Sequence, residues 1–186
     1  MISWTALLLP ALISAVLVFF VSSVIHMMLK WHNPDYRKLP NEDDVRAVIR
    51  KGAPTPGQYI VPHCTHGKDA QNPETMRKFE EGPIACIYIK PNGMIKLGPF
   101  LGKWVVYTLV VGLLAGYVAR FTLLPGAPFL NVFRVVGTAA WLAYAWQSPA
   151  DSIWKGKPWI VAFRDMVDGL VYALITAAVF GWLWPR

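Results

Sequence analysis

Charged residues are scarce in this chain of 186 residues, and they are unevenly placed. They make up 16% of the sequence, whereas a soluble domain usually carries about a quarter. Most of them lie between Lys30 and Lys103, and long stretches on either side have almost none. This distribution argues against an ordinary soluble domain and is typical of a membrane protein with one soluble segment.

Cysteine is also rare, since Cys64 and Cys86 are the only two in the chain. A disulfide framework needs more cysteines and an oxidising compartment, so a single bridge stays open but is not implied. The sequence also lacks a nucleic-acid-binding motif. Its net charge of +7 comes mainly from basic residues beside apolar stretches, where anionic lipid headgroups are the simpler partner. We therefore expect a lipid bilayer as partner and no nucleic acid.

Catalytic signatures are absent as well, so we assign no catalytic residue and no cofactor, and an enzyme is the less favoured interpretation. The first apolar run, LLLPALISAVLVFFVSSVI, does not have the pattern of a signal peptide. It lacks a basic segment before it and a small-residue cleavage site followed by a polar start. We expect this run to be a membrane helix.

Four apolar runs predict transmembrane helices, at about residues 4–29, 104–124, 130–146 and 166–184. The first is long enough to cross a hydrocarbon core of ~30 Å as a helix, and the last two are short unless they begin inside their polar flanks. Tryptophans lie near the ends of the runs, where indole prefers the headgroup layer. The predicted fold is an α-helical integral membrane protein: four transmembrane helices with a small α+β soluble insert between helices 1 and 2.

The predicted domains are, in order, a first transmembrane helix, the soluble insert and three further transmembrane helices: residues 1–30, 31–99 and 100–186. The segment from Lys30 to Lys103 holds twelve basic residues, against three on the opposite side of the membrane: Arg120, Arg134 and Arg186. Because basic loops stay on the cytoplasmic side, we expect both termini outside and the insert in the cytoplasm.

The insert has the pattern of a compact module rather than of a floppy linker. NPETMRKFEEG predicts a helix capped by Asn72, with Pro73 in its first position. IACIYIKPNGMIKLG predicts a β-hairpin around Asn92–Gly93. A module of roughly 65 residues buries only a marginal core by itself, so we expect it to lean on the membrane surface or on a partner.

The stretch IVPHCTHGKD places His63, Cys64 and His66 within four positions. Structural zinc takes four ligands, usually Cys and His, and Cys86 supplies a fourth if its strand lies beside the segment Gln58–Val61. The spacing matches no common zinc finger, and the side chains converge only if the chain turns. A metal site at His63, Cys64, His66 and Cys86 is therefore one hypothesis, and a polar surface turn is the other.

A second group of metal-ligand side chains lies in IHMMLKWH, at the end of the first apolar run. His26, Met27, Met28 and His32 are suited to copper, which accepts imidazole and thioether ligands. On a helix, however, His26 and Met27 point about 100° apart, so only some of the group share a face. The alternative is ordinary methionine packing beside interfacial histidines.

Four charged residues lie near the third and fourth runs: Arg134, Arg164, Asp165 and Asp168. Ionisable residues inside a membrane are costly and are therefore functional candidates. Arg164 is spaced to pair with Asp168 one helical turn later, and Asp165 is placed to meet a basic residue of the insert. Arg134 is expected at the outer end, far from the aspartates. The alternative is that all four are interfacial and reach water.

The stretches FRVVGTAAWLAYAWQSPADSIWKGKPW and DGLVYALITAAVFGWLWP, together with the first apolar run and LPNEDDV, resemble small uncharacterised bacterial inner-membrane proteins. The resemblance implies a multi-pass protein of the bacterial inner (plasma) membrane, and it brings no activity and no site residues. The Gly112–Gly116 G-x-x-x-G pattern fits either packing within the bundle or oligomerisation.

Two functions remain as hypotheses. The first is a non-enzymatic membrane protein, an accessory subunit or oligomeric scaffold that docks through its insert as a homo-oligomer or within a larger membrane complex. The second is a copper- or zinc-binding membrane protein that supports metal handling or redox chemistry.

Overall fold

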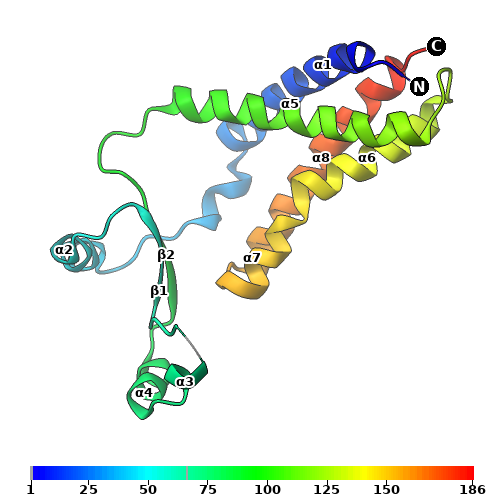
Figure 1. Cartoon of the computed structure of the whole chain (residues 1–186). Coiled ribbons are helices and arrows are strands. Elements are labelled where there is room, and N and C mark those ends of the chain that lie inside the picture. Colours follow the sequence, from blue (N-terminus) through cyan, green and yellow to red (C-terminus); the bar gives the residue numbers. More distant parts are fainter. Residues whose placement is uncertain (1, 66) are drawn as a thin grey trace. The chain divides into compact units, whose positions relative to one another are not determined.

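The computed structural model describes residues 2–65 and 67–186, and it is mostly helical with one small sheet (Figure 1). Contacts divide the chain into two compact units: unit 1 is Met1–Tyr36 with Lys96–Arg186, and unit 2 is Arg37–Ile95. The elements of unit 1 are α1 (Trp4–Ser23), a π turn (Val24–Met28), a 3-10 helix (Lys30–Asp35), α5 (Leu97–Thr122), α6 (Phe129–Ala145), α7 (Gln147–Lys155) and α8 (Trp159–Trp182). The elements of unit 2 are α2 (Glu42–Gly52), β1 (Gly57–Val61), α3 (Gly67–Ala70), α4 (Pro73–Glu81) and β2 (Ala85–Ile89).

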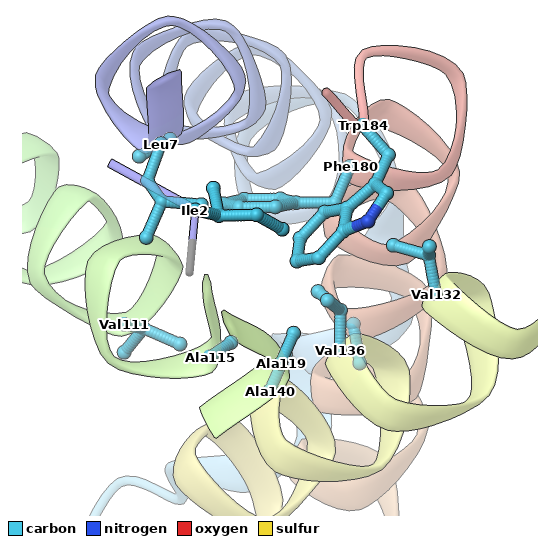
Figure 2. Packing of buried hydrophobic residues seen from close by; sticks show 12 residues of the cluster. Ile2, Leu7, Val111, Ala115, Ala119, Val132, Val136, Ala140, Phe180 and Trp184 are labelled. Carbon is cyan, nitrogen blue, oxygen red and sulfur yellow. The ribbon is translucent and has the colours of Figure 1, made fainter. Parts of the chain in front are cut away.

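Unit 1 is a helical bundle in which α6 and α8 form the most extensive pair, while α5 packs against α1 and α6. Its core is built largely from alanine and valine, with a few larger side chains at one end (Figure 2). There Ile2 and Leu7 meet Phe180 and Trp184 in one buried cluster. The Trp184 indole N–H also donates to the Leu124 carbonyl at 3.1 Å, which ties the end of the chain to the α5–α6 connection.

Small residues let these helices approach closely. A Cβ added at Gly116 would lie 2.7 Å from Phe180 Cε1, and one added at Gly112 would lie 3.2 Å from Ser14 Oγ. Both contacts are too close for a larger side chain without movement of the neighbour. The G-x-x-x-G face of α5 is therefore used inside the chain, for packing against α1 and α8.

Two helices are long and apolar enough to cross a membrane: Trp4–Met28 with 25 residues and Leu97–Thr122 with 26. Large apolar side chains remain exposed on them, for example Phe20 at 62% and Phe121 at 60% exposure. The helix α6 has 17 residues, fewer than the ~20 that span a bilayer, and the first turns of α8 carry charges. Two of the four predicted transmembrane helices are thus supported, and with them an association with membranes.

Unit 2 contains a two-stranded antiparallel sheet in which β1 pairs with β2 and Ile60 lies opposite Cys86. The predicted hairpin around Asn92–Gly93 is wrong, because residues 90–96 form no strand. Pro91 lies two residues after the end of β2 and has no N–H to donate to a ladder. In addition, Asn92 does not take the positive φ that a type I′ turn requires at both central residues. The strand β2 pairs with the earlier β1 instead.

Unit 2 has local order but little packing. Asn72 caps α4 as predicted, since its Oδ1 accepts from the Glu74 N–H at 2.9 Å. By contrast, none of the residues of this unit whose burial is described is buried, and all five positions of β1 are exposed. A local cap therefore sets the start of α4, while the residues of unit 2 whose burial is described supply no buried core.

Candidate functional site

The polar site of unit 1 begins where α1 ends. The helix widens into the π turn at Val24–Met28, Leu29 takes an extended backbone (φ −84°, ψ 133°), and the 3-10 helix Lys30–Asp35 follows. A proline inside that last segment prevents an α-helix from continuing. Turns of the π type are frequent at functional sites. The break brings His26 and His32, six positions apart, to a ring-centroid distance of 4.6 Å.

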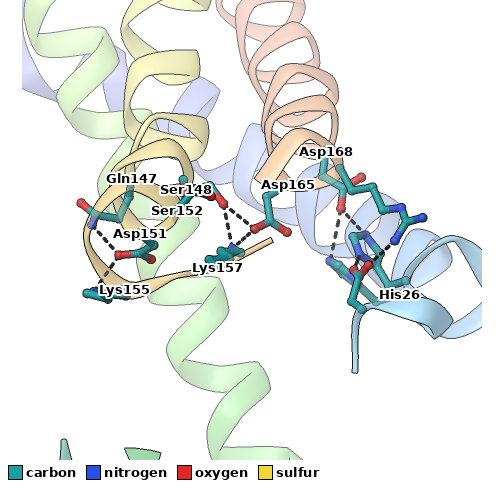
Figure 3. Close-up of polar contacts among 12 residues, drawn as sticks. His26, Gln147, Ser148, Asp151, Ser152, Lys155, Lys157, Asp165 and Asp168 are labelled. Carbon is teal, nitrogen blue, oxygen red and sulfur yellow. Dashed lines mark hydrogen bonds and ion pairs between the residues drawn. The ribbon is translucent and has the colours of Figure 1, made fainter. Parts of the chain in front are cut away.

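Asp168 of α8 completes this cluster (Figure 3). Its Oδ2 lies 2.7 Å from His32 Nε2 and 3.7 Å from His26 Nε2. The carboxylate is buried, with 6% of the residue exposed. The Tyr172 hydroxyl, one helical turn further along α8, lies 3.3 Å from His26 Nε2. A buried carboxylate of α8 therefore meets two imidazoles from the π turn and the 3-10 helix that follow α1.

Asp35 and Arg164 hold His32 from the other side. The Nδ1 of His32 lies 2.6 Å from Asp35 Oδ2, and Arg164 donates to Asp35 Oδ1. Burial lowers the pKa of His32, but hydrogen bonds to Asp35 and Asp168 outweigh it, and the pKa ends above its usual value. Burial likewise raises the pKa of Asp35, but hydrogen bonds from His32 and Arg164 bring that pKa below its usual value. The metal-free cluster thus favours a charged His32 between two carboxylates.

His26, His32 and Asp168 have the geometry to hold a metal ion. One donor atom from each lies within 4.8 Å of the others. In a tetrahedral zinc site, donors that are ~2.0–2.1 Å from the ion are roughly 3.3 Å apart. The present separations of 2.7 and 3.7 Å bracket that value. The two separations that involve Asp168 are therefore close to those of a zinc site, and the two histidine donors lie within 4.8 Å of each other.

The surroundings of His32 match those of a metal ligand. A ligating histidine usually donates its second ring N–H to a carboxylate, which fixes the ring and raises its basicity. Asp35 accepts in that position at 2.6 Å from Nδ1, and Arg164 fixes Asp35 in turn. The site therefore has both a set of three donors and an outer support for one of them.

A second polar network lies beside the cluster and is labelled in Figure 3. The Ser148 hydroxyl donates to Asp165 Oδ2 at 2.6 Å. Lys157 donates to Asp165 and to Ser148, the latter at 2.7 Å. A cavity of about 260 Å³ is lined by this network and also by His26 and Asp168. The two polar groups therefore open onto one shared space.

The charged residues singled out near the third and fourth apolar runs find different partners from those predicted. Arg164 bonds Asp35 rather than Asp168, because the 3-10 segment brings a second carboxylate to it. Asp165 pairs with Lys157 of the α7–α8 connection rather than with the insert. Arg134 is exposed in the first turns of α6.

The predicted zinc residues belong to unit 2. Cys86 lies in β2, which does pair with the strand that ends at Val61, and it faces Ile60 in the register. His63 is exposed and Cys64 is half-buried, while His66 lies outside the described residues. A zinc site in this loop stays a prediction.

Sequence reasoning missed Asp35, Ser148 and Lys157. Asp35 follows His32 at a spacing of three, which is the one signal that points to it; the pairing of Lys157 with Asp165 depends on how α7 folds back. Of the predicted copper group, the two histidines come together, whereas Met27 and Met28 are each 74% exposed.

Comparison with family models, with curated proteins and with solved structures finds no match to this chain. The resemblance to bacterial inner-membrane proteins therefore stays a prediction.

Proposed function

We propose that this chain is an integral membrane protein that binds a divalent metal ion, of the kind typified by Zn²⁺, through His26, His32 and Asp168. The observation that carries the proposal is their convergence from the π turn, the 3-10 helix and α8, with donor atoms within 4.8 Å of one another. Two imidazoles and one carboxylate suit zinc and similar divalent ions. Cu(I) prefers softer ligands, and the methionines that could supply them, Met27 and Met28, are each 74% exposed.

The proposed setting is a bundle of four transmembrane helices, α1, α5, α6 and α8, in a bacterial inner membrane. Exposed apolar side chains also follow the outer face of α8: Ile160, Phe163, Leu170 and Leu174. The distribution of lysine and arginine favours both termini outside, with unit 2 and the metal site at the cytoplasmic face. Labelling of Cys64 in intact cells by a membrane-impermeant thiol reagent would contradict this orientation.

The metal proposal is tested by elemental analysis of the full chain purified without an affinity tag and then exposed to Zn²⁺ and desalted. We expect one equivalent of zinc in the wild type and its loss in H32A and D168N. Matched substitutions in the loop of unit 2, His63→Ala and Cys64→Ser, should retain it. Zinc that is lost in the loop variants but kept in H32A and D168N would move the site to unit 2. Zinc that none of these variants changes, or that stays far below one equivalent, would contradict the proposal.

A second function, docking on a protein partner, is favoured by a separate observation. No residue of unit 2 with described burial is buried, and a two-stranded sheet by itself is at best marginally stable. We propose that another subunit, or a second copy of the chain, covers unit 2. Cross-linking of native membranes followed by mass spectrometry should recover links from unit 2 to that partner. A monodisperse monomer that recovers no partner would contradict it.

A further inference from the structure

The cavity beside the histidine–aspartate cluster has two chemically different walls. His26, Asp168 and Tyr172 form one wall, and Ser148, Lys157 and Asp165 form the other. Its volume of about 260 Å³ exceeds that of one water, which takes up ~30 Å³ in the liquid. The space is therefore large enough for a small ligand that contacts both walls.

A metal ion bound in the cluster would present a coordination position to this space. Structural zinc sites close with four protein ligands, whereas sites with three protein ligands keep a fourth position for water or substrate. Two of the three proposed ligands, His26 and Asp168, line the cavity. The fourth ligand would therefore come from the cavity side.

The charges around the cavity decide which ligand fits. Three of the four carboxylates near the site already have a cationic partner, in the pairs Asp35–Arg164, Asp165–Lys157 and Asp151–Lys155. Metal-bound imidazoles are neutral, so Asp168 alone opposes a divalent ion and one positive charge remains. Asp168 is 6% exposed, but the His26 side chain is 49% exposed, so a small anion from solution can reach the remaining positive charge and is attracted to it.

We propose that the metal-loaded site takes up one small monoanion with an oxygen or nitrogen donor, such as a short carboxylate, as the fourth ligand. This inference rests on the metal binding proposed above. The anion balances the remaining positive charge. Lys157 offers a further contact on the opposite wall, since its ammonium has three donors and bonds to Asp165 and Ser148 use two of them.

The test uses the full chain loaded with Co²⁺, whose visible spectrum reports the ligands of the ion. Azide and formate are titrated in turn at constant ionic strength, with perchlorate as the weakly coordinating balance. We expect each anion to change the cobalt bands saturably, with one anion bound per ion. A stoichiometric cobalt complex whose bands neither anion changes would overturn this inference alone. Failure to bind cobalt at all would instead overturn the proposed metal site.

Asp165→Asn tests the charge argument without touching a proposed ligand. It removes one negative charge from the cavity wall, so the affinity for azide should rise several-fold. The matched control is Asp43→Asn in unit 2, where the Asp43 side chain is 92% exposed, and it should leave the affinity unchanged. An affinity that stays the same or falls in D165N, while the cobalt spectrum without azide matches the wild type, would contradict the charge-balance argument.

Discussion

Unit 1 buries large side chains completely, with Leu7, Val18 and Phe180 at 0% exposure, whereas unit 2 buries none of the residues whose burial is described. Both units have well-formed helices. The helices α2 and α4 of unit 2 are strongly amphipathic, yet their apolar faces find no buried place within the unit. Both units therefore have regular secondary structure, but the buried core lies in unit 1.

The difference in core packing determines which unit can hold a site of defined geometry. A cluster of donors keeps its spacing only if the elements that carry it are held rigidly. His26 and Asp168 stand on helices locked by core packing, so the distances between them are set by the bundle. The ligand-type side chains of unit 2 stand on a strand and a loop that have no such support. Equivalent substitutions in the two units test this difference.

The largest expected effect comes from truncating a core aromatic. Phe180→Ala removes a side chain with 0% exposure, which should cost about 3–5 kcal/mol of unfolding free energy through lost contacts and a cavity. The matched variant Phe79→Ala, in α4 of unit 2, truncates a side chain that is only half-buried, and it should cost about 1 kcal/mol or less. Hydrogen exchange in detergent, read separately for the two units, measures both, because all nine tryptophans lie in unit 1 and their fluorescence would not report on unit 2. Equal losses would contradict the contrast between the units.

The next effect comes from an ion pair. Arg164→Met removes one of the two cationic partners of Asp35, whose side chain is 4% exposed, and leaves it with His32. Breaking a buried pair costs about 3 kcal/mol, and we expect a loss of up to that size. The equivalent change in unit 2, Arg77→Met, breaks an exposed pair with Glu81, which is worth at most about 1 kcal/mol. Hydrogen exchange, read separately for the two units, compares the two. An Arg164→Met variant no less stable than Arg77→Met would show that Asp35 reaches water.

A smaller effect is expected from pH. The pKa of His32 lies above its usual 6.5, so its stabilising contribution is complete below that pH and is lost as the pH rises through the folded pKa. The pKa of Asp35 lies below its usual 3.8, so its contribution is complete above that pH and is lost as the pH falls through the folded pKa. The metal-free protein should therefore lose stability as the pH rises from 6.5.

Unfolding midpoints in a chelating buffer across that range measure this effect. His32→Gln should flatten the decline, whereas His63→Gln in unit 2 should leave it intact. A wild-type protein whose midpoint is constant, or rises with pH above 6.5, would contradict the direction of the His32 pKa.

Much of the fold follows from local sequence signals. The first two apolar runs predict the helices that are long enough to span a membrane, and the Asn72 cap marks the start of α4. The hairpin prediction was wrong because a strand pairs with whichever segment lies beside it. The segment after β2 contains Pro91 and forms no strand, so β2 pairs with β1. No periodicity in the sequence of β2 carries that information.

The site was only partly predictable for a similar reason. His26, His32 and Asp168 were each candidates from residue type and position, but they belonged to different hypotheses. Their convergence depends on the break at Leu29 and on the side-by-side packing of α1 and α8. Arg164 was expected to bond Asp168 within its own helix. It bonds Asp35 instead, because the break after α1 places that carboxylate beside it.

The smallest expected effect comes from replacing a glycine by alanine, which should lower the stability of unit 1 and raise that of unit 2. Gly112→Ala places a Cβ 3.2 Å from Ser14 Oγ, and that hydroxyl is held by a bond to the Ala11 carbonyl at 3.0 Å. Because the neighbour cannot move freely, a loss of about 1 kcal/mol is expected. Gly52→Ala, at the end of α2, meets nothing within 4 Å, so better helix propensity should stabilise unit 2 by roughly 0.5 kcal/mol. Hydrogen exchange resolves the two units separately. Stabilisation of unit 1 by Gly112→Ala would mean that α1 and α5 pack more loosely than their small-residue face requires.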